Sequence, residues 1–229
     1  MAQAAPRFGP EALKFLRALK RNNRREWFQP RKEQYDALVK RPALEIVARL
    51  ADDLRPFAPE VIADPKTAIY RIYRDTRFSN DKTPYKTHIA ASFPWRGLPR
   101  HEGAGLYFHV SPTEVWIGGG MYAPPTAQLH IVRQHIANNH RRLRSIVESA
   151  GFKRVFGALE GERLTRVPRG FPRDHAASEW LRFRQYLAGR EVAPGVATAP
   201  RFYATVLETF RVAVPLIRFL NEPLVSRGR

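Results

Sequence analysis

The chain has 229 residues, with 39 Lys and Arg against 21 Asp and Glu, a formal net charge of +18 and no Cys. Without Cys, the protein has no disulfides, thiolate nucleophiles, Cys-ligated zinc or iron–sulfur clusters, and a hydrophobic content of 44% excludes a disordered or collagen-like chain. No apolar run approaches the roughly 20 residues of a membrane span, and the first residues lack the apolar core of a secretory signal, so we expect a soluble, cytoplasmic protein.

The positive charge is spread along the chain and is not carried by a terminal arm. Residues 1–114 contain 21 basic and 13 acidic residues, and residues 115–229 contain 18 and 8. Arg outnumbers Lys by 31 to 8; GC-rich codons explain part of the Arg excess but not the scarcity of acidic residues. A field of this sign attracts polyanions, including nucleic acid. The charge therefore indicates an anionic partner without identifying it.

Helical patterns open the chain. Apolar residues at helical spacing predict a helix over 11–21. Pro30 suits the first turn of a second helix, and Pro42 is expected to end it and to open a third that runs to about Arg55.

From residue 67 to residue 122 the pattern becomes that of a sheet. We expect strands over 68–73, 87–95, 104–110 and 114–117, the last two joined by a tight hairpin at Ser111-Pro112-Thr113. Four successive strands with no helix between them predict an antiparallel meander.

Helical patterns then return. One helix follows Pro125 and is expected to end near Gly151 as its C-cap, and a second has Asp174 as its expected N-cap and carries Leu187. Pro200 opens a last helix, which we expect to be kinked or broken at Pro215. The fold class is α+β: a central antiparallel β-meander with N-terminal and C-terminal helices packed on it. We expect a single domain over residues 8–225 with short disordered termini.

The segment between the first two expected strands is the strongest candidate for a site. At about twelve residues (75–86) it is longer than a hairpin needs. Residues 71–86 contain five cations against two carboxylates. Arg offers a planar fork for phosphate or carboxylate and Lys a mobile charge, while Phe78 and Tyr85 offer flat rings. The expected ligand-binding residues are Arg74, Arg77, Ser79, Lys82, Tyr85 and Lys86.

A structural interpretation competes with this one. Asp75 and Asp81 can pair with neighbouring cations and pin a long loop, with Phe78 and Tyr85 as its hydrophobic anchors. We favour the functional interpretation because an anchored loop does not need five cations.

Residues 71–88, RIYRDTRFSNDKTPYKTH, resemble the signature of the bacterial and fungal family catalogued as domain of unknown function 2461. Other segments are also similar to it: Asn22-Asn23 with Glu26-Trp27-Phe28, Leu106 to Val110, Gly118 to Gly120, and Gly170-Phe171 with Asp174-His175. The resemblance covers about residues 8–225. It implies no activity, cofactor or partner.

The remaining candidates carry weaker signals. His109, in an expected strand beside Tyr107, can act as an acid or base, although a half-buried His bonded to backbone or Tyr is the more common case. Residues 130, 135 and 140 are His, but steps of five place them on different sides of a helix, so we expect no metal site and no cofactor. Gly118 to Gly120 can let a ligand approach the backbone, but a bulge or strand exit is the better interpretation.

Three functions follow. In the first, residues 71–88 bind a phosphate-bearing or other anionic ligand, including nucleic acid; salt-dependent binding weakened by Arg77→Ala and Lys82→Ala would support it. In the second, the protein is an enzyme for a small anionic substrate, with Asp75 or Asp81 as base or metal ligand and with Asp75, Arg77, Lys82 and His109 converging on one pocket. In the third, the basic loop docks an acidic protein partner. The oligomeric state stays open.

Overall fold

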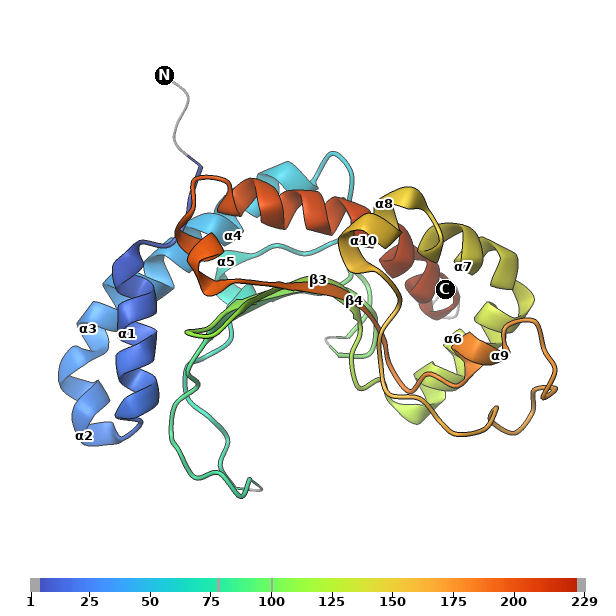
Figure 1. Ribbon diagram of the computed structural model, residues 1–229, viewed down its shortest axis with the longest axis horizontal. Helices are drawn as coiled ribbons and strands as arrows, with labels where there is room; N and C mark the ends of the chain where they lie inside the picture. The colour runs from blue at the N-terminus through green and yellow to red at the C-terminus, as the bar shows by residue number, and fades with distance from the viewer. Residues whose placement is uncertain (1–4, 78, 100, 226–229) are drawn as a thin grey trace.

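A computed structural model describes residues 5–77, 79–99 and 101–225, and it has the form of an arch around a central sheet (Figure 1). The first leg and its connection to the sheet contain α1 (Pro10–Arg21), α2 (Arg25–Phe28), η1 (Gln29–Arg31), α3 (Lys32–Tyr35), η2 (Asp36–Lys40), α4 (Arg41–Leu54) and α5 (Pro65–Ala68). The sheet contains β1 (Ile89–Phe93), β2 (Gly105–Val110), β3 (Val115–Met121) and β4 (Tyr186–Val192). The rest of the chain forms α6 (Thr126–Asn138), α7 (His140–Val147), α8 (Ala150–Phe156), α9 (Ser178–Leu181), η3 (Pro194–Thr198) and α10 (Phe202–Val225).

The sheet has the order β1-β2-β3-β4 and is antiparallel throughout. The α+β class and the antiparallel sheet are therefore confirmed. The meander covers β1, β2 and β3, whereas α6, α7, α8 and α9 separate β3 from β4 in the chain. The hairpin at residues 111–114 also forms, and the Ser111 hydroxyl accepts hydrogen bonds from the backbone N–H groups of Thr113 and Glu114.

The membership of the sheet differs from the prediction. Residues 68–73 form no strand; they make only single bridges, Ile69 with Ala91 and Tyr73 with Tyr85. Pro84 lies in the opposing segment and has no N–H to donate, which is one reason that no regular ladder develops there. The fourth strand is β4, a segment whose Leu187 we expected in a helix.

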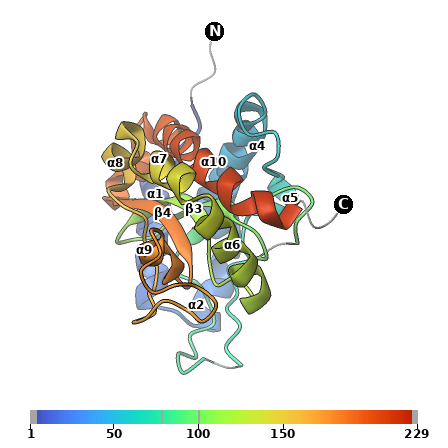
Figure 2. The same ribbon diagram turned by 90° about the vertical axis from the view of Figure 1, so that its right-hand side faces the viewer.

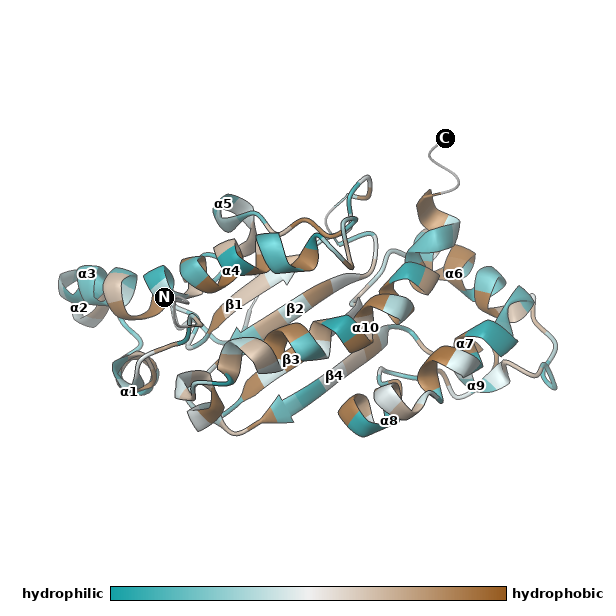
Figure 3. Cartoon of the chain, turned by 90° about the horizontal axis from the view of Figure 1, so that it is seen from above, coloured by the Kyte–Doolittle hydropathy of each residue, from teal (hydrophilic) through white to brown (hydrophobic). Residues whose placement is uncertain are grey.

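The two faces of the sheet have different neighbours. Leu106, Phe108 and Val110 point toward α10 and are at most 1% exposed. Seen from above, α10 lies along the sheet and α4 lies nearer to β1 (Figure 3). The side view shows both helices on one side of the sheet, while the 71–88 segment extends on the other (Figure 2). The second face, which carries Tyr107 and His109, is therefore the inner side of the arch.

Several predicted helix boundaries are wrong. Pro42 opens α4 as expected but does not end the preceding helix: the backbone stays helical through a π-turn over Asp36–Lys40, because Pro42 cannot donate the usual hydrogen bond. Gly151 lies inside α8 and is not a C-cap. The N-cap of α9 is Ala177 instead of Asp174. Pro215 lies inside α10, which continues to Val225, so of the expected kink or break the break does not occur.

In the part of the chain that the structure describes, none of the helices combines the length and the apolar character of a membrane span.

Candidate functional site

The inner face of the sheet contains a groove with a volume of about 720 Å³. Tyr107 on β2 and Trp116 on β3 line it, with ring centroids 5.7 Å apart. Both side chains alternate along their strands with residues buried toward α10. The groove is lined further by aromatic and small side chains, which include Tyr70, Ala90, Ser92, Trp95, Gly105, Gly120 and Tyr122.

Glycines make room for the rings in this groove. The indole of Trp116 lies across Gly189, where an added Cβ would be 2.0 Å from the ring. A Cβ on Gly120 would lie 2.0 Å from the carbonyl oxygen of Tyr186. Gly118 to Gly120 keep a regular register with both neighbouring strands, so the predicted bulge or strand exit is wrong. Gly189 thus lets a ring lie on the backbone, and Gly120 lets the backbone of β3 approach that of β4 closely.

A chain of hydrogen bonds fixes the hydroxyl of Tyr107. His109 Nε2 lies 3.1 Å from Glu114 Oε1, and His109 Nδ1 lies 3.2 Å from the Tyr107 hydroxyl oxygen. An ionised carboxylate only accepts, so the proton of a neutral His109 is on Nε2 and the hydroxyl of Tyr107 donates to Nδ1. Burial raises the pKa of Tyr107, which keeps the hydroxyl protonated at neutral pH. His109 is thus a half-buried histidine bonded to Tyr and Glu, and it positions a ring of the groove.

His88 extends the polar end of the groove. Its ring centroid lies 5.4 Å from that of His109. Burial, together with the electrostatic effects of His109 and Lys86, lowers the pKa of His88 to about 4. His88 is therefore neutral at physiological pH, and its ring can donate one hydrogen bond and accept another.

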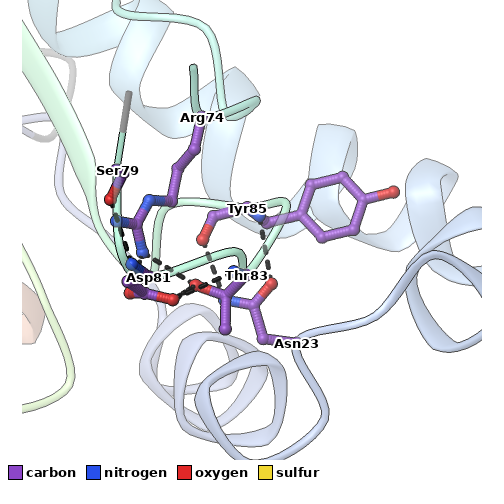
Figure 4. Close-up of polar contacts among 6 residues, drawn as sticks. All are labelled: Asn23, Arg74, Ser79, Asp81, Thr83 and Tyr85. Atoms are coloured by element: carbon purple, nitrogen blue, oxygen red, sulfur yellow. Dashed lines mark hydrogen bonds and ion pairs between the residues drawn. The ribbon is translucent and has the colours of Figure 1, made fainter. Parts of the chain in front are cut away.

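The 71–88 segment encloses a second cavity, of about 570 Å³, with the end of α1. Asn23 holds the segment in place: its side-chain amide donates to the Tyr85 carbonyl oxygen at 2.8 Å and accepts from the Tyr85 N–H at 3.0 Å (Figure 4). The Asn23 side chain thus makes with Tyr85 the pair of hydrogen bonds that the backbone of a neighbouring strand would make. The cavity is lined by Lys20, Asn23, Arg74, Asp75, Asp81, Thr83, Tyr85, Lys86, Thr87 and His88.

Two ion pairs organise the loop. Arg74 pairs with Asp81 and also donates to the Thr83 hydroxyl at 2.7 Å (Figure 4). Arg77 donates to both carboxylate oxygens of Asp75, at 3.0 and 2.8 Å. The expected pairing of loop carboxylates with loop cations therefore occurs.

These pairs weaken the proposed role of the loop carboxylates as bases. Hydrogen bonds from Arg77 lower the pKa of Asp75 to about 2, and hydrogen bonds from Thr83 and Arg74 lower that of Asp81 to about 2. A carboxylate with such a pKa is a weak base near neutral pH. Moreover, the four residues of the enzyme hypothesis do not converge: Asp75 lines the loop cavity and His109 the groove, whereas Arg77 and Lys82 are among the described residues that line neither.

The other expected ligand residues differ in position. Ser79 accepts from the Asp81 N–H at 3.2 Å, and Lys82 Nζ donates to the Thr76 carbonyl at 3.0 Å, so both brace the loop. The Tyr85 ring is 1% exposed and packs on Phe28 at 4.2 Å between centroids. We expected it to stack on a ligand, but its burial makes it an anchor. Phe78 lies outside the described residues.

Lys86 lies where the two cavities meet. It lines both of them, as does His88. Its ammonium nitrogen is 5.0 Å from the centroid of the Tyr70 ring, which itself lines the groove. The cationic segment and the aromatic groove are thus adjacent and share two lining residues.

Sequence reasoning missed most of the groove. It singled out His109 but not Tyr70, Trp95, Trp116 or Tyr122. The available signal was the alternation of β2, in which polar or aromatic residues occupy every second position, together with the glycines of β3 opposite.

Two weaker sequence signals remain, the histidines considered for a metal site and the Asp174-His175 pair. Among the described residues, no group of three or more His, Asp and Glu is placed to hold a metal ion. Asp174-His175, one of the segments that resemble the family, lies beside the start of α7, where the His175 ring is 5.8 Å from that of His140.

A family model described as "Conserved hypothetical protein (DUF2461)" matches residues 11–219. No curated protein and no solved structure matches the chain.

Proposed function

We propose that this chain, which belongs to the DUF2461 family of conserved hypothetical proteins, binds a ligand that carries a phosphate or another anionic group. The binding place is the junction of the 71–88 segment with the groove. One observation carries the proposal: Lys86 and His88 line both cavities, so a cation lies at the mouth of an aromatic groove.

The charges of the loop cavity support this choice. Three cations line it, Lys20, Arg74 and Lys86, against the two carboxylates of Asp75 and Asp81, and Asp81 orients Arg74. An oriented guanidinium and a mobile ammonium are the groups that proteins use for oxyanions. The net charge of +18 adds a long-range field that raises the local concentration of anions.

The structure changes which cation is the best to test. Arg77 and Lys82, the two residues favoured above, are among the described residues that line neither cavity. Lys86 is the cation that both cavities share. Lys86→Ala therefore removes the central charge, and Lys82→Ala, in the same segment, is the matched control.

Calorimetric titration of the full chain with pyrophosphate, at low and at physiological salt, tests the proposal. We expect the affinity for pyrophosphate to fall as the salt concentration rises. Lys86→Ala should lower this affinity roughly ten-fold, the effect of losing one charge-assisted hydrogen bond. Lys82→Ala should change it by less than about two-fold. No binding at low salt, or equal affinities of the two variants, would contradict the proposal.

A further inference from the structure

We propose that the groove holds a nucleotide unit, with its base stacked on the Tyr107 ring and its phosphate at Lys86. The inference rests on the proposed function and specifies its ligand. It uses the inner face of the sheet in addition to the residues of the 71–88 segment.

The aromatic lining of the groove is the first argument. The Tyr107 ring meets the Tyr70 ring edge-on, at 6.4 Å between centroids, and the tilted Trp116 ring at 5.7 Å. All three line the groove. Every base has a flat π-face, and protein rings on an open surface bind bases by stacking. The hydrogen bond from Tyr107 to His109 holds this platform at a fixed angle, which lowers the entropy lost on binding.

Among the residues that line the groove, a cation lies at one end and a carboxylate at the other. Lys86 and His88 precede β1, beside the end of β2 that carries His109. Glu160 lines the groove at the other end of the strands, since it bridges Leu187, which pairs with Gly120. A phosphate is favoured at the first end and opposed at the second. A carboxylate at the second end accepts from the exocyclic amino group of a base such as cytosine.

The distances suit the base and the phosphate of one nucleotide. The Lys86 ammonium nitrogen lies 5.0 Å from the centroid of the Tyr70 ring, which is 6.4 Å from the centroid of the Tyr107 ring. The groove's volume of about 720 Å³ lies within the range of small-molecule sites. Between the two ends, the small residues Ala90 and Gly105 line the groove and leave space for a ligand.

The test compares ligands with and without a base. The full chain is titrated with cytidine monophosphate, uridine monophosphate and inorganic phosphate. We expect the cytidine nucleotide to bind at least roughly ten-fold more tightly than phosphate, which is the size of one stacking contact. Tyr107→Leu should reduce the affinity for cytidine monophosphate to that for inorganic phosphate. Tyr107→Phe keeps the ring and should therefore retain most of the difference between the two affinities.

The variants separate the two proposals. Lys86→Ala should weaken phosphate and nucleotide alike, and Tyr107→Leu only the nucleotide; thermal melting confirms that each variant is folded. Equal affinity for phosphate and nucleotide, or an unchanged affinity in Tyr107→Leu, overturns the nucleotide while leaving the anion site intact. If neither ligand binds, both proposals fail.

Two more comparisons define the ligand. A Glu160→Gln variant should reduce the preference for cytidine over uridine monophosphate. If the parent protein shows no such preference, the proposed orientation, with the base toward Glu160, is overturned.

A single-stranded hexanucleotide separates the two sources of the ligand. If it binds more than ten-fold more tightly than the mononucleotide, the groove holds a nucleic-acid strand, and equal affinity assigns it to a free nucleotide.

Discussion

The two faces of β2 show how one strand serves two purposes. Toward α10, Phe108 is fully buried and packs on Phe93 and Phe202. Toward the inside of the arch, Tyr107 and His109 are only partly buried and line a groove. Since successive side chains point to opposite faces, neighbouring residues of one strand contribute separately to stability and to the site. The comparison implies that these two properties can be separated by mutation.

The largest effect is expected from Phe108→Ala. It removes a fully buried ring beneath α10, so the free energy of unfolding should fall by about 3–5 kcal/mol. Tyr107→Ala, one residue away, should cost only roughly 1–2 kcal/mol, since the ring is partly exposed. Urea titration followed by circular dichroism measures both. Equal losses would show that the inner face is also a structural core.

The glycines of the inner face provide the next test. Gly189→Ala places a Cβ where the Trp116 indole lies, so we expect a loss of roughly 1–3 kcal/mol and a shift of the tryptophan emission. Gly151→Ala is the matched control, because a Cβ there meets nothing within 4 Å and Gly151 lies in α8; it should stabilise by about 0.5–1 kcal/mol. An unchanged melting temperature in Gly189→Ala would mean that the indole has other places to lie.

The smallest effect concerns pH. The pKa of His88 is about 4 when folded and near 6.5 in the unfolded chain, so between these values the unfolded chain binds more protons. Stability is therefore full above about pH 6.5 and falls as the pH drops toward 4. Because the ring is only partly buried, we expect a loss on the order of 1–2 kcal/mol between pH 7 and pH 4.5.

His88→Gln should remove this part of the pH dependence. Chemical denaturation of the parent and the variant at the two pH values isolates it from His135, whose pKa burial also lowers. The carboxylates of Asp75 and Asp81 do not interfere, since the stability that depends on them is lost only from about pH 4 to pH 2. Identical losses in both proteins would contradict the assignment to His88.

Part of the candidate site could be predicted from sequence. The density of cations in residues 71–86 located the segment, and of its expected residues Arg74, Asp75, Asp81, Tyr85 and Lys86 line one cavity. The roles of these side chains could not be predicted. Whether Arg77 faces a ligand or Asp75, and whether the Tyr85 ring is exposed or packs on Phe28, depends on the path of the loop and on α2, which is distant in sequence.

The sequence alone determined the local features: the α+β class, the hairpin after Val110 and the alternation that divides β2 into two faces. Their physical cause acts within a few residues, through helical or strand periodicity and turn chemistry. Only the tertiary structure decided that β4 completes the sheet beside β3, that its Gly189 makes room for Trp116, and that Lys86 reaches the groove. Those contacts join segments far apart in the chain, and the energy that selects them arises from packing and pairing that no local pattern contains.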